Sequence, residues 1–348
     1  MRSISKATII LGAVLLACGL STLLIQQNKS LGQQYSVEMK AFSEWATEYS
    51  RNYQTPEEKN YRFKIFSENL MTIRRHQLTK SSYTVGLNSF ADLSTEEFKA
   101  KISGPFTRES LLQVHGAQTF NIPDSLGQVP TIDWRRYLQQ QSISTSRNCN
   151  SNYAWISAVN MNANYYIKHS VPSQYSFSPQ TYIDCSANFG NSGCNGGNPM
   201  NSYSYSQNWG IDTMQNYPYY DRQGPCTSST GFFKNSGVYK VSSLSNTELY
   251  KALAARNVIT VLIDISGAQF YTGGVFTGPC TTTVNHALLL VGAGIDKDSG
   301  NTYWSVLNTW GSSWGELGYM RIKRFTIDGS QTYSSCGLNM YAHFPTFQ

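Results

Sequence analysis

The sequence predicts an α+β protein, in which a helical N-terminal segment precedes a body with a helix-rich half and a strand-rich half. Between residues 35 and 101, apolar residues recur at helical spacing, as in Phe42, Trp45 and Tyr49. In the body, a helix is expected over residues 153–169. After residue 239, short apolar runs separated by Gly and Asn indicate strands, expected over residues 258–265, 287–291, 303–307 and 319–324.

The first residues have the layout of a secretory signal. Two basic residues precede an apolar run over residues 7–16, and small residues follow, with cleavage expected after Gly19. The run then resumes to give about 19 mostly apolar residues, long enough to cross a bilayer if uncleaved. A signal anchor is therefore the alternative, and the residues ending at Cys18 also resemble a bacterial lipid-attachment box. Residues 1–27 are predicted to direct the body into an oxidising compartment.

A pro-segment and linker are expected between the signal and the body. A second helical stretch over residues 57–77 opens at Thr55-Pro56. From residue 104 to 129 the sequence turns irregular, with Gly, Pro and Gln, which is typical of a linker. The predicted domains are residues 28–127 for the pro-segment with its linker and 128–348 for the body, whose halves cover about 136–240 and 241–340.

Charge excludes one class of function. Only 14% of the 348 residues are charged, and the net charge of +6 is spread along the chain. Nucleic-acid-binding domains concentrate basic residues on one face, and no such pattern or motif occurs here. No nucleic-acid partner is expected, and a membrane partner is expected only if the N-terminal segment stays uncleaved.

The cysteine count indicates disulfides rather than a metal site. Of seven cysteines, Cys18 lies in the targeting segment, which leaves an even number in the body. In an oxidising compartment six cysteines predict three disulfides, and the absence of any CxxC pair argues against zinc. The body cysteines are Cys149, Cys185, Cys194, Cys226, Cys280 and Cys336.

Several motifs occur in a fixed order along the body. They are Asp133-Trp134-Arg135, Cys149-Asn150-Ser151-Asn152-Tyr153-Ala154-Trp155, Asp184-Cys185-Ser186, Gly193-Cys194-Asn195-Gly196-Gly197, Gly278-Pro279-Cys280, Asn285-His286-Ala287 and Asn308-Thr309-Trp310-Gly311-Ser312-Ser313-Trp314-Gly315. Their order and spacing resemble papain-family cysteine peptidases of the cathepsin L type. A set of upstream residues resembles the motifs of the family's inhibitory propeptide. The residues are Glu58, Arg62, Phe66, Asn69, Ile73, Gly86, Asn88, Phe90 and Asp92.

The resemblance implies a two-domain papain-like fold, with a helical domain, a β-barrel-like domain and a cleft between them. It also implies that a helical propeptide lies along the cleft, and it implies no cofactor and no metal. The disulfide pairs that it implies are Cys149–Cys194, Cys185–Cys226 and Cys280–Cys336.

The chemistry of the family needs a thiolate, an imidazole that takes its proton and an amide that orients the imidazole. The resemblance assigns the base to His286, the orienting amide to Asn308 and the shielding indole to Trp310. At the nucleophile position stands Asn152, whose carboxamide has no acidic proton to give up. The oxyanion-hole glutamine aligns with Ser146, and losing one such donor typically costs about 10²–10³ in rate. We therefore expect a catalytically inactive homologue, a pseudopeptidase.

Two neighbouring residues are candidate substitutes for the nucleophile. Ser151 is one residue away, but a shift of one helical position re-aims a side chain by about 100°. Cys149 would have to leave Cys194 unpaired. Asn152 itself is interpreted as the N-cap of the helix that begins at Tyr153. The alternatives are an active endopeptidase with an unorthodox nucleophile and an inhibitor of related peptidases that acts through its pro-segment.

A peptide-binding groove is expected to persist. Glycines leave the backbone open to an extended ligand, which pairs with main-chain groups. The expected partners are a peptide or protein ligand and the chain's own propeptide, and the expected location is the lysosome or vacuole, or outside the cell. The groove positions are Gly196, Gly197, Asn198, Pro199, Ala287 and Trp310.

Overall fold

The computed structural model describes residues 26–27, 29, 32–102, 104, 117–120, 131–138, 149–170, 175–227, 231–242, 244–324 and 335–348. The chain divides into two compact units, residues 1–71 and 72–348. The expected signal up to residue 25, most of the expected linker and Ser146 lie outside the described residues. Within the described part, no helix is both long and apolar enough to cross a membrane.

The N-terminal unit is built from aromatic residues on two helices. Residues 32–48 are helical, and α2 (Pro56–Gln77) begins in this unit. Phe42, Trp45 and Phe66 are buried, and the ring centroid of Phe66 lies 5.3 Å from each of the other two rings. The helical spacing of Phe42 and Trp45 therefore marks the buried face of their helix, as expected.

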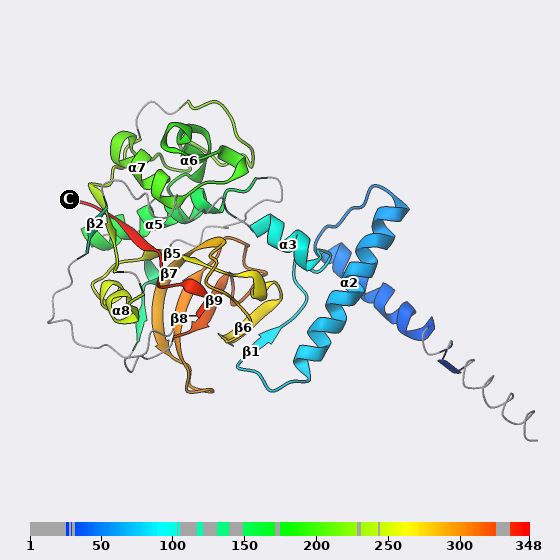
Figure 1. Cartoon of the computed structure of the whole chain (residues 1–348). Coiled ribbons are helices and arrows are strands. Elements are labelled where there is room, and N and C mark those ends of the chain that lie inside the picture. The colour runs from blue at the N-terminus through cyan, green and yellow to red at the C-terminus, as the bar shows by residue number, and fades with distance from the viewer. Residues whose placement is uncertain are drawn as a thin grey trace, which may run out of the picture. The chain divides into compact units, whose positions relative to one another are not determined.

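The second unit contains the helix-rich half. Figure 1 shows α5 beside α6 and α7, and on its other side the strands. Helix α7 starts where the Asn198 side chain accepts a hydrogen bond from Met200 N (3.0 Å), with Pro199 as its first residue. The expected helix over 153–169 is confirmed. The helices of this half are α5 (Asn152–His169), α6 (Pro179–Cys185) and α7 (Pro199–Trp209).

The strand-rich half is one mixed sheet, with strand order β1-β6-β9-β8-β7-β5-β10-β4-β2 and β3 paired to β7. The four strands that the sequence predicts are confirmed as β5, β7, β8 and β9. The strands are β1 (Tyr83–Val85), β2 (Gln118–Thr119), β3 (Ile132–Asp133), β4 (Gly237–Lys240), β5 (Ile259–Ile263), β6 (Tyr271–Phe276), β7 (His286–Ile295), β8 (Thr302–Leu307), β9 (Tyr319–Lys323) and β10 (Ala342–Thr346), with helix α8 (Asn246–Ala254) preceding β5.

Buried β-branched and leucine side chains explain why β5 and β7 lie in the middle of this sheet. Every residue of β5 is buried, and so is every residue of β7 up to Gly294. Strands covered on both faces are expected to read as continuous apolar runs rather than as alternating ones. One face carries α5, which packs through Ile156, Val159 and Ala163 against the sheet.

Part of the pro-segment belongs to this second unit. Strand β1 pairs antiparallel with β6, and α3 (Thr95–Ile102) buries Phe98 and Ile102 in the same apolar cluster as the sheet. The Asn88 side chain donates to Gln269 O (2.7 Å), and Gln269 Nε2 donates to Phe90 O (3.1 Å). The end of the pro-segment is therefore fastened to the body by a strand pair, an apolar helix face and two reciprocal amide contacts.

Three disulfides hold the second unit. They join Cys149 to Cys194, Cys185 to Cys226 and Cys280 to Cys336, the pairs that the resemblance implies. Two lie in the helix-rich half, and the third joins the loop after β6 to the segment before β10. Each closes a loop of more than 40 residues, with sequence separations of 45, 41 and 56, and so limits the freedom of the unfolded chain.

Candidate active site

Asn152 is the first residue of α5, and it does not cap the helix as expected. The N-cap is Ser151, whose side chain makes no capping hydrogen bond. The cap interpretation was wrong because local sequence shows only that an Asn precedes a helix. In the structure its carboxamide is used by a partner 135 residues away.

The Asn152 carboxamide spans the junction between α5 and β7. Its Oδ1 accepts from Ala287 N (3.2 Å), and its Nδ2 donates to Ala287 O (3.1 Å). The same Nδ2 donates to Thr309 Oγ1 at 3.0 Å and lies 3.2 Å from His286 Nε2. An amide nitrogen has two protons, and Ala287 O and Thr309 Oγ1 accept both. The carboxamide is thus satisfied without the imidazole.

His286 begins β7 and is held by Asn308, which follows β8. Its Nε2 lies 2.9 Å from Asn308 Oδ1, and its ring centroid is 4.9 Å from that of Trp310. We assign the imidazole proton to Nε2, because Asn308 Oδ1 accepts there and the Asn152 protons are already used. Nδ1 is then the nitrogen with a free lone pair.

The pro-segment covers that second nitrogen. The carbonyl oxygen of Ile102, the last residue of α3, lies 3.4 Å from His286 Nδ1. Two residues on, Gly104 N donates to Asn285 O at 2.9 Å. Phe90 and Phe98 pack edge-on against Trp310, with centroid distances of 5.1 and 5.5 Å. His286 is consequently only 2% exposed.

Burial sets the protonation state of the imidazole. Desolvation lowers the pKa of His286 to about 4, although the oxygen atoms of Asn308 and Ile102 beside its ring nitrogens favour the charged form and act in the opposite direction. The imidazole is therefore neutral at neutral pH and is protonated only as the pH approaches 4. A neutral, covered imidazole beside a carboxamide has no proton to take and no charged partner.

Comparison with known proteins identifies the family of the chain. Residues 129–346 match the family model described as "Papain family cysteine protease". The chain belongs to the papain family of cysteine proteases. Residues 42–98 match a second description, "Cathepsin propeptide inhibitor domain (I29)", so the expected pro-segment is an inhibitory propeptide domain by family.

Relatives and solved structures cover most of the chain. Fruit bromelain of Ananas comosus is 36% identical over 89% of this chain and 87% of its own. A cathepsin L-like proteinase of Fasciola hepatica is 35% identical over 87% of this chain and 93% of its own. Procathepsin L 3 of Tenebrio molitor larval midgut superposes with a TM-score of 0.79 at 28% identity, covering 89% and 99% of the two chains. The papain-like fold and the resemblance are confirmed.

The expected groove positions 196–199 lie in a loop that packs against the start of α5 and continues into α7. Gly196, Gly197, Asn198 and Pro199 are buried. A Cβ on Gly197 would lie 2.8 Å from the Tyr153 ring, so this glycine is needed for packing of the loop against α5. The carbonyl of Cys194 accepts from Asn150 N at 2.9 Å, which ties the same loop to the start of the helix.

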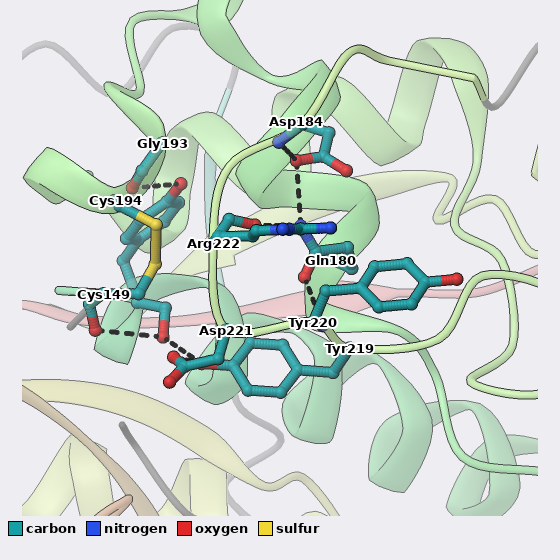
Figure 2. The surroundings of a disulfide bond; sticks show 12 residues. Cys149, Gln180, Asp184, Gly193, Cys194, Tyr219, Tyr220, Asp221 and Arg222 are labelled. Carbon is teal, nitrogen blue, oxygen red and sulfur yellow. Dashed lines mark hydrogen bonds between the residues drawn. A yellow bond between two sulfur atoms is a disulfide. The ribbon is translucent and has the colours of Figure 1, made fainter. Parts of the chain in front are cut away.

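Ser151, the neighbour of Asn152, is engaged on the other side of the helix start. It is fully buried, and its hydroxyl lies 3.1 Å from the Tyr219 hydroxyl, which donates to Asp221 Oδ1 at 3.0 Å. Figure 2 shows Tyr219 and Asp221 next to the Cys149–Cys194 disulfide. These contacts hold the loop around residue 220 against the N-terminus of α5.

The sequence predicts Ala287 as a groove position, but not its backbone as the partner of Asn152, and it gives no role to the Thr309 hydroxyl or the Ile102 carbonyl. Thr309 is part of the motif that begins at Asn308. The two backbone groups carry no residue-type signal, so only the folded arrangement identifies them.

Acid is expected to destabilise the fold through its buried histidines. The unfolded chain protonates His286 near its ordinary pKa of 6.5 and the folded chain only near 4, so stability is full above pH 6.5 and is lost as the pH falls towards 4. The lowered pKa of His286 contributes about 3 kcal/mol to the free energy of unfolding at neutral pH. Burial and nearby Lys240 also lower the pKa of His343 to about 4, which adds a similar loss.

Urea unfolding at pH 7, 5.5 and 4 measures this dependence. His286→Gln should lose about half of the pH-dependent drop that the two buried histidines cause. Asn195→Gln is the control, because Asn195 is exposed and has no titratable group, so the drop should be unchanged. An equal pH dependence in wild type and His286→Gln would contradict the assignment.

Proposed function

We propose that this chain is a non-catalytic member of the papain family, a pseudopeptidase of the secretory or lysosomal route whose cleft holds its own pro-segment and binds peptides or a protein partner. The observation that carries the proposal is the Asn152 carboxamide at the nucleophile position, bonded through Oδ1 and Nδ2 to Ala287 and Thr309. A thiolate attacks because it has a reactive lone pair. An amide nitrogen that is donating both protons offers none.

The neighbouring groups that could replace a thiol support the same proposal. Cys149 is bonded to Cys194, and the Ser151 hydroxyl lies 3.1 Å from the Tyr219 hydroxyl and 3.4 Å from the carbonyl oxygen of Cys149. All six body cysteines are paired, which also fits an oxidising compartment. A nucleophile would have to be made by breaking one of these contacts.

The pro-segment is proposed as the resident ligand. Ile102 and Gly104 meet the backbone and imidazole at the start of β7, while Phe98 fills the space over Trp310. The contacts combine main-chain pairing with an apolar anchor, which is the general way in which extended peptides are held by a sheet edge. A peptide or protein partner would compete with this segment for the same groups.

Self-processing tests the proposal. Purified full-length chain held at pH 4.5 is expected to keep its pro-segment, because cleavage of its own peptide bond needs a nucleophile. An active papain-family peptidase added in trace amounts is the positive control, since it should trim the same chain. The proposal fails if the purified chain trims itself and the trimming stops when one particular serine or cysteine is replaced.

A further inference from the structure

Two asparagines of α5 make the same bidentate contact with the sheet. Asn152 pairs with both backbone groups of Ala287, as described above. Asn164 does the same with Val258: its Oδ1 accepts from Val258 N at 3.0 Å, and its Nδ2 donates to Val258 O at 2.8 Å. In each case a carboxamide takes the place that a peptide group of a neighbouring strand would occupy.

Both backbone positions lie where a neighbouring strand does not reach. Strand β8 pairs with β7 from Leu289 onward, which leaves Ala287 beyond the end of that ladder. Strand β10 pairs with Thr260 and Val261 of β5, which leaves Val258 beyond it. Buried backbone groups without a partner are costly, so these two residues need a donor and an acceptor from elsewhere.

The two contacts sit at opposite ends of one antiparallel strand pair. Ala287 is opposite Leu262 in the β5–β7 register, and Val258, the residue before β5, lies four residues earlier than Leu262, about 13 Å away. Asn152 and Asn164 are twelve residues apart, or about 18 Å along the helix axis. Between them, the Asn160 carboxamide lies within hydrogen-bond distance of the hydroxyls of Tyr203 on α7 (2.9 Å) and Thr260 on β5 (2.7 Å).

We propose that these two contacts are clamps that fasten α5, and with it the helix-rich half, to the β5–β7 pair, and that Asn152 is one of them. We name them the carboxamide clamps, Asn152–Ala287 and Asn164–Val258. The inference goes beyond inactivity, because it gives Asn152 a role of its own in holding the two halves together. A cysteine at residue 152 has only one weak donor and one weak acceptor on a single atom and cannot pair with both backbone groups of Ala287, so clamp and thiolate exclude each other.

Amide hydrogen exchange in the full-length chain tests the clamps one at a time. Asn152→Ala should speed exchange of the Ala287 amide roughly tenfold or more, and leave the Val258 amide unchanged. Asn164→Ala should do the reverse. The matched control is Asn162→Ala on the same helix, because Asn162 is buried but donates to Tyr175 O within the helix-rich half. It should change neither amide.

Exchange of side-chain amide protons in the wild-type chain tests the clamps even if a variant fails to fold. The Nδ2 protons of Asn152 and Asn164 should exchange slowly in the full-length chain, whereas those of exposed Asn195 exchange fast. The inference is overturned if Asn152 exchanges as fast as Asn195, or if Asn152→Ala speeds both backbone amides equally. Neither readout uses activity, so failure of the clamps and failure of the proposed function remain distinguishable.

Discussion

Replacing Phe98 by alanine is expected to lower the free energy of unfolding by about 3–5 kcal/mol. Phe98 is 0% exposed on α3, and its ring centroid lies 5.3 Å from that of Phe90 and 5.5 Å from that of Trp310. The substitution removes a ring from a packed cluster that includes the sheet, and the strand pair β1–β6 holds the same part of the pro-segment, so the cavity can collapse only in part. The loss measures how far the pro-segment is part of the core.

Urea unfolding of the full-length chain measures this effect. Phe232→Ala is the matched control, because Phe232 is 75% exposed and its loss should change stability by no more than about 0.5 kcal/mol. If Phe98→Ala costs less than about 1 kcal/mol, α3 is not part of the core and the pro-segment is not the resident ligand of the site.

Restoring a cysteine at residue 152 is expected to raise peptide turnover by several orders of magnitude, but only after the pro-segment has been removed. His286, Asn308 and Trp310, which we propose as the base, orienting amide and shielding indole, lie in contact with one another. In the full-length chain the Ile102 carbonyl faces His286 Nδ1, and burial keeps the pKa of the imidazole near 4, so it cannot take a thiol proton. Adding Ser146→Gln should raise turnover by a further factor of about 10²–10³.

The reactivity of the new thiol checks the cause. Near an imidazole at a helix N-terminus a thiol has a pKa well below its ordinary value of about 8.5. Asn152→Cys freed from its pro-segment should therefore be alkylated rapidly at pH 6, and Asn152→Cys/His286→Gln should not. Equal alkylation rates would mean that His286 is no longer placed to act as a base.

Much of the fold follows from local sequence. The spacing of apolar residues predicts α5 and the four main strands, because helices and strands bury one face or both at a fixed period. The motif order identifies the family, and with it the places of His286 and Asn308. In both cases the information is carried by residue types at short range.

The function of Asn152 could not be read in the same way. An Asn before a helix is a favoured cap, and nothing near it in sequence indicates Ala287 as its partner. The same holds for Asn164 and Val258, 94 residues apart, and for Asn88 and Gln269, 181 residues apart. Only the three-dimensional arrangement of the strands shows which backbone N–H and C=O groups at a strand end have no partner from a neighbouring strand. Asparagines among the apolar residues of a predicted helix are the one sequence signal for such contacts, because a buried polar side chain needs a hydrogen-bond partner.

The most direct test is turnover of a fluorogenic peptide by purified wild-type body, freed from its pro-segment by an added peptidase that is then removed. The Asn152→Cys/Ser146→Gln variant, treated in the same way, reports whether the treated body is folded. We expect no turnover by wild type above a buffer blank, and clear turnover by the variant. Wild-type turnover that disappears when a single serine or cysteine is replaced would contradict the assignment of this chain as a pseudopeptidase.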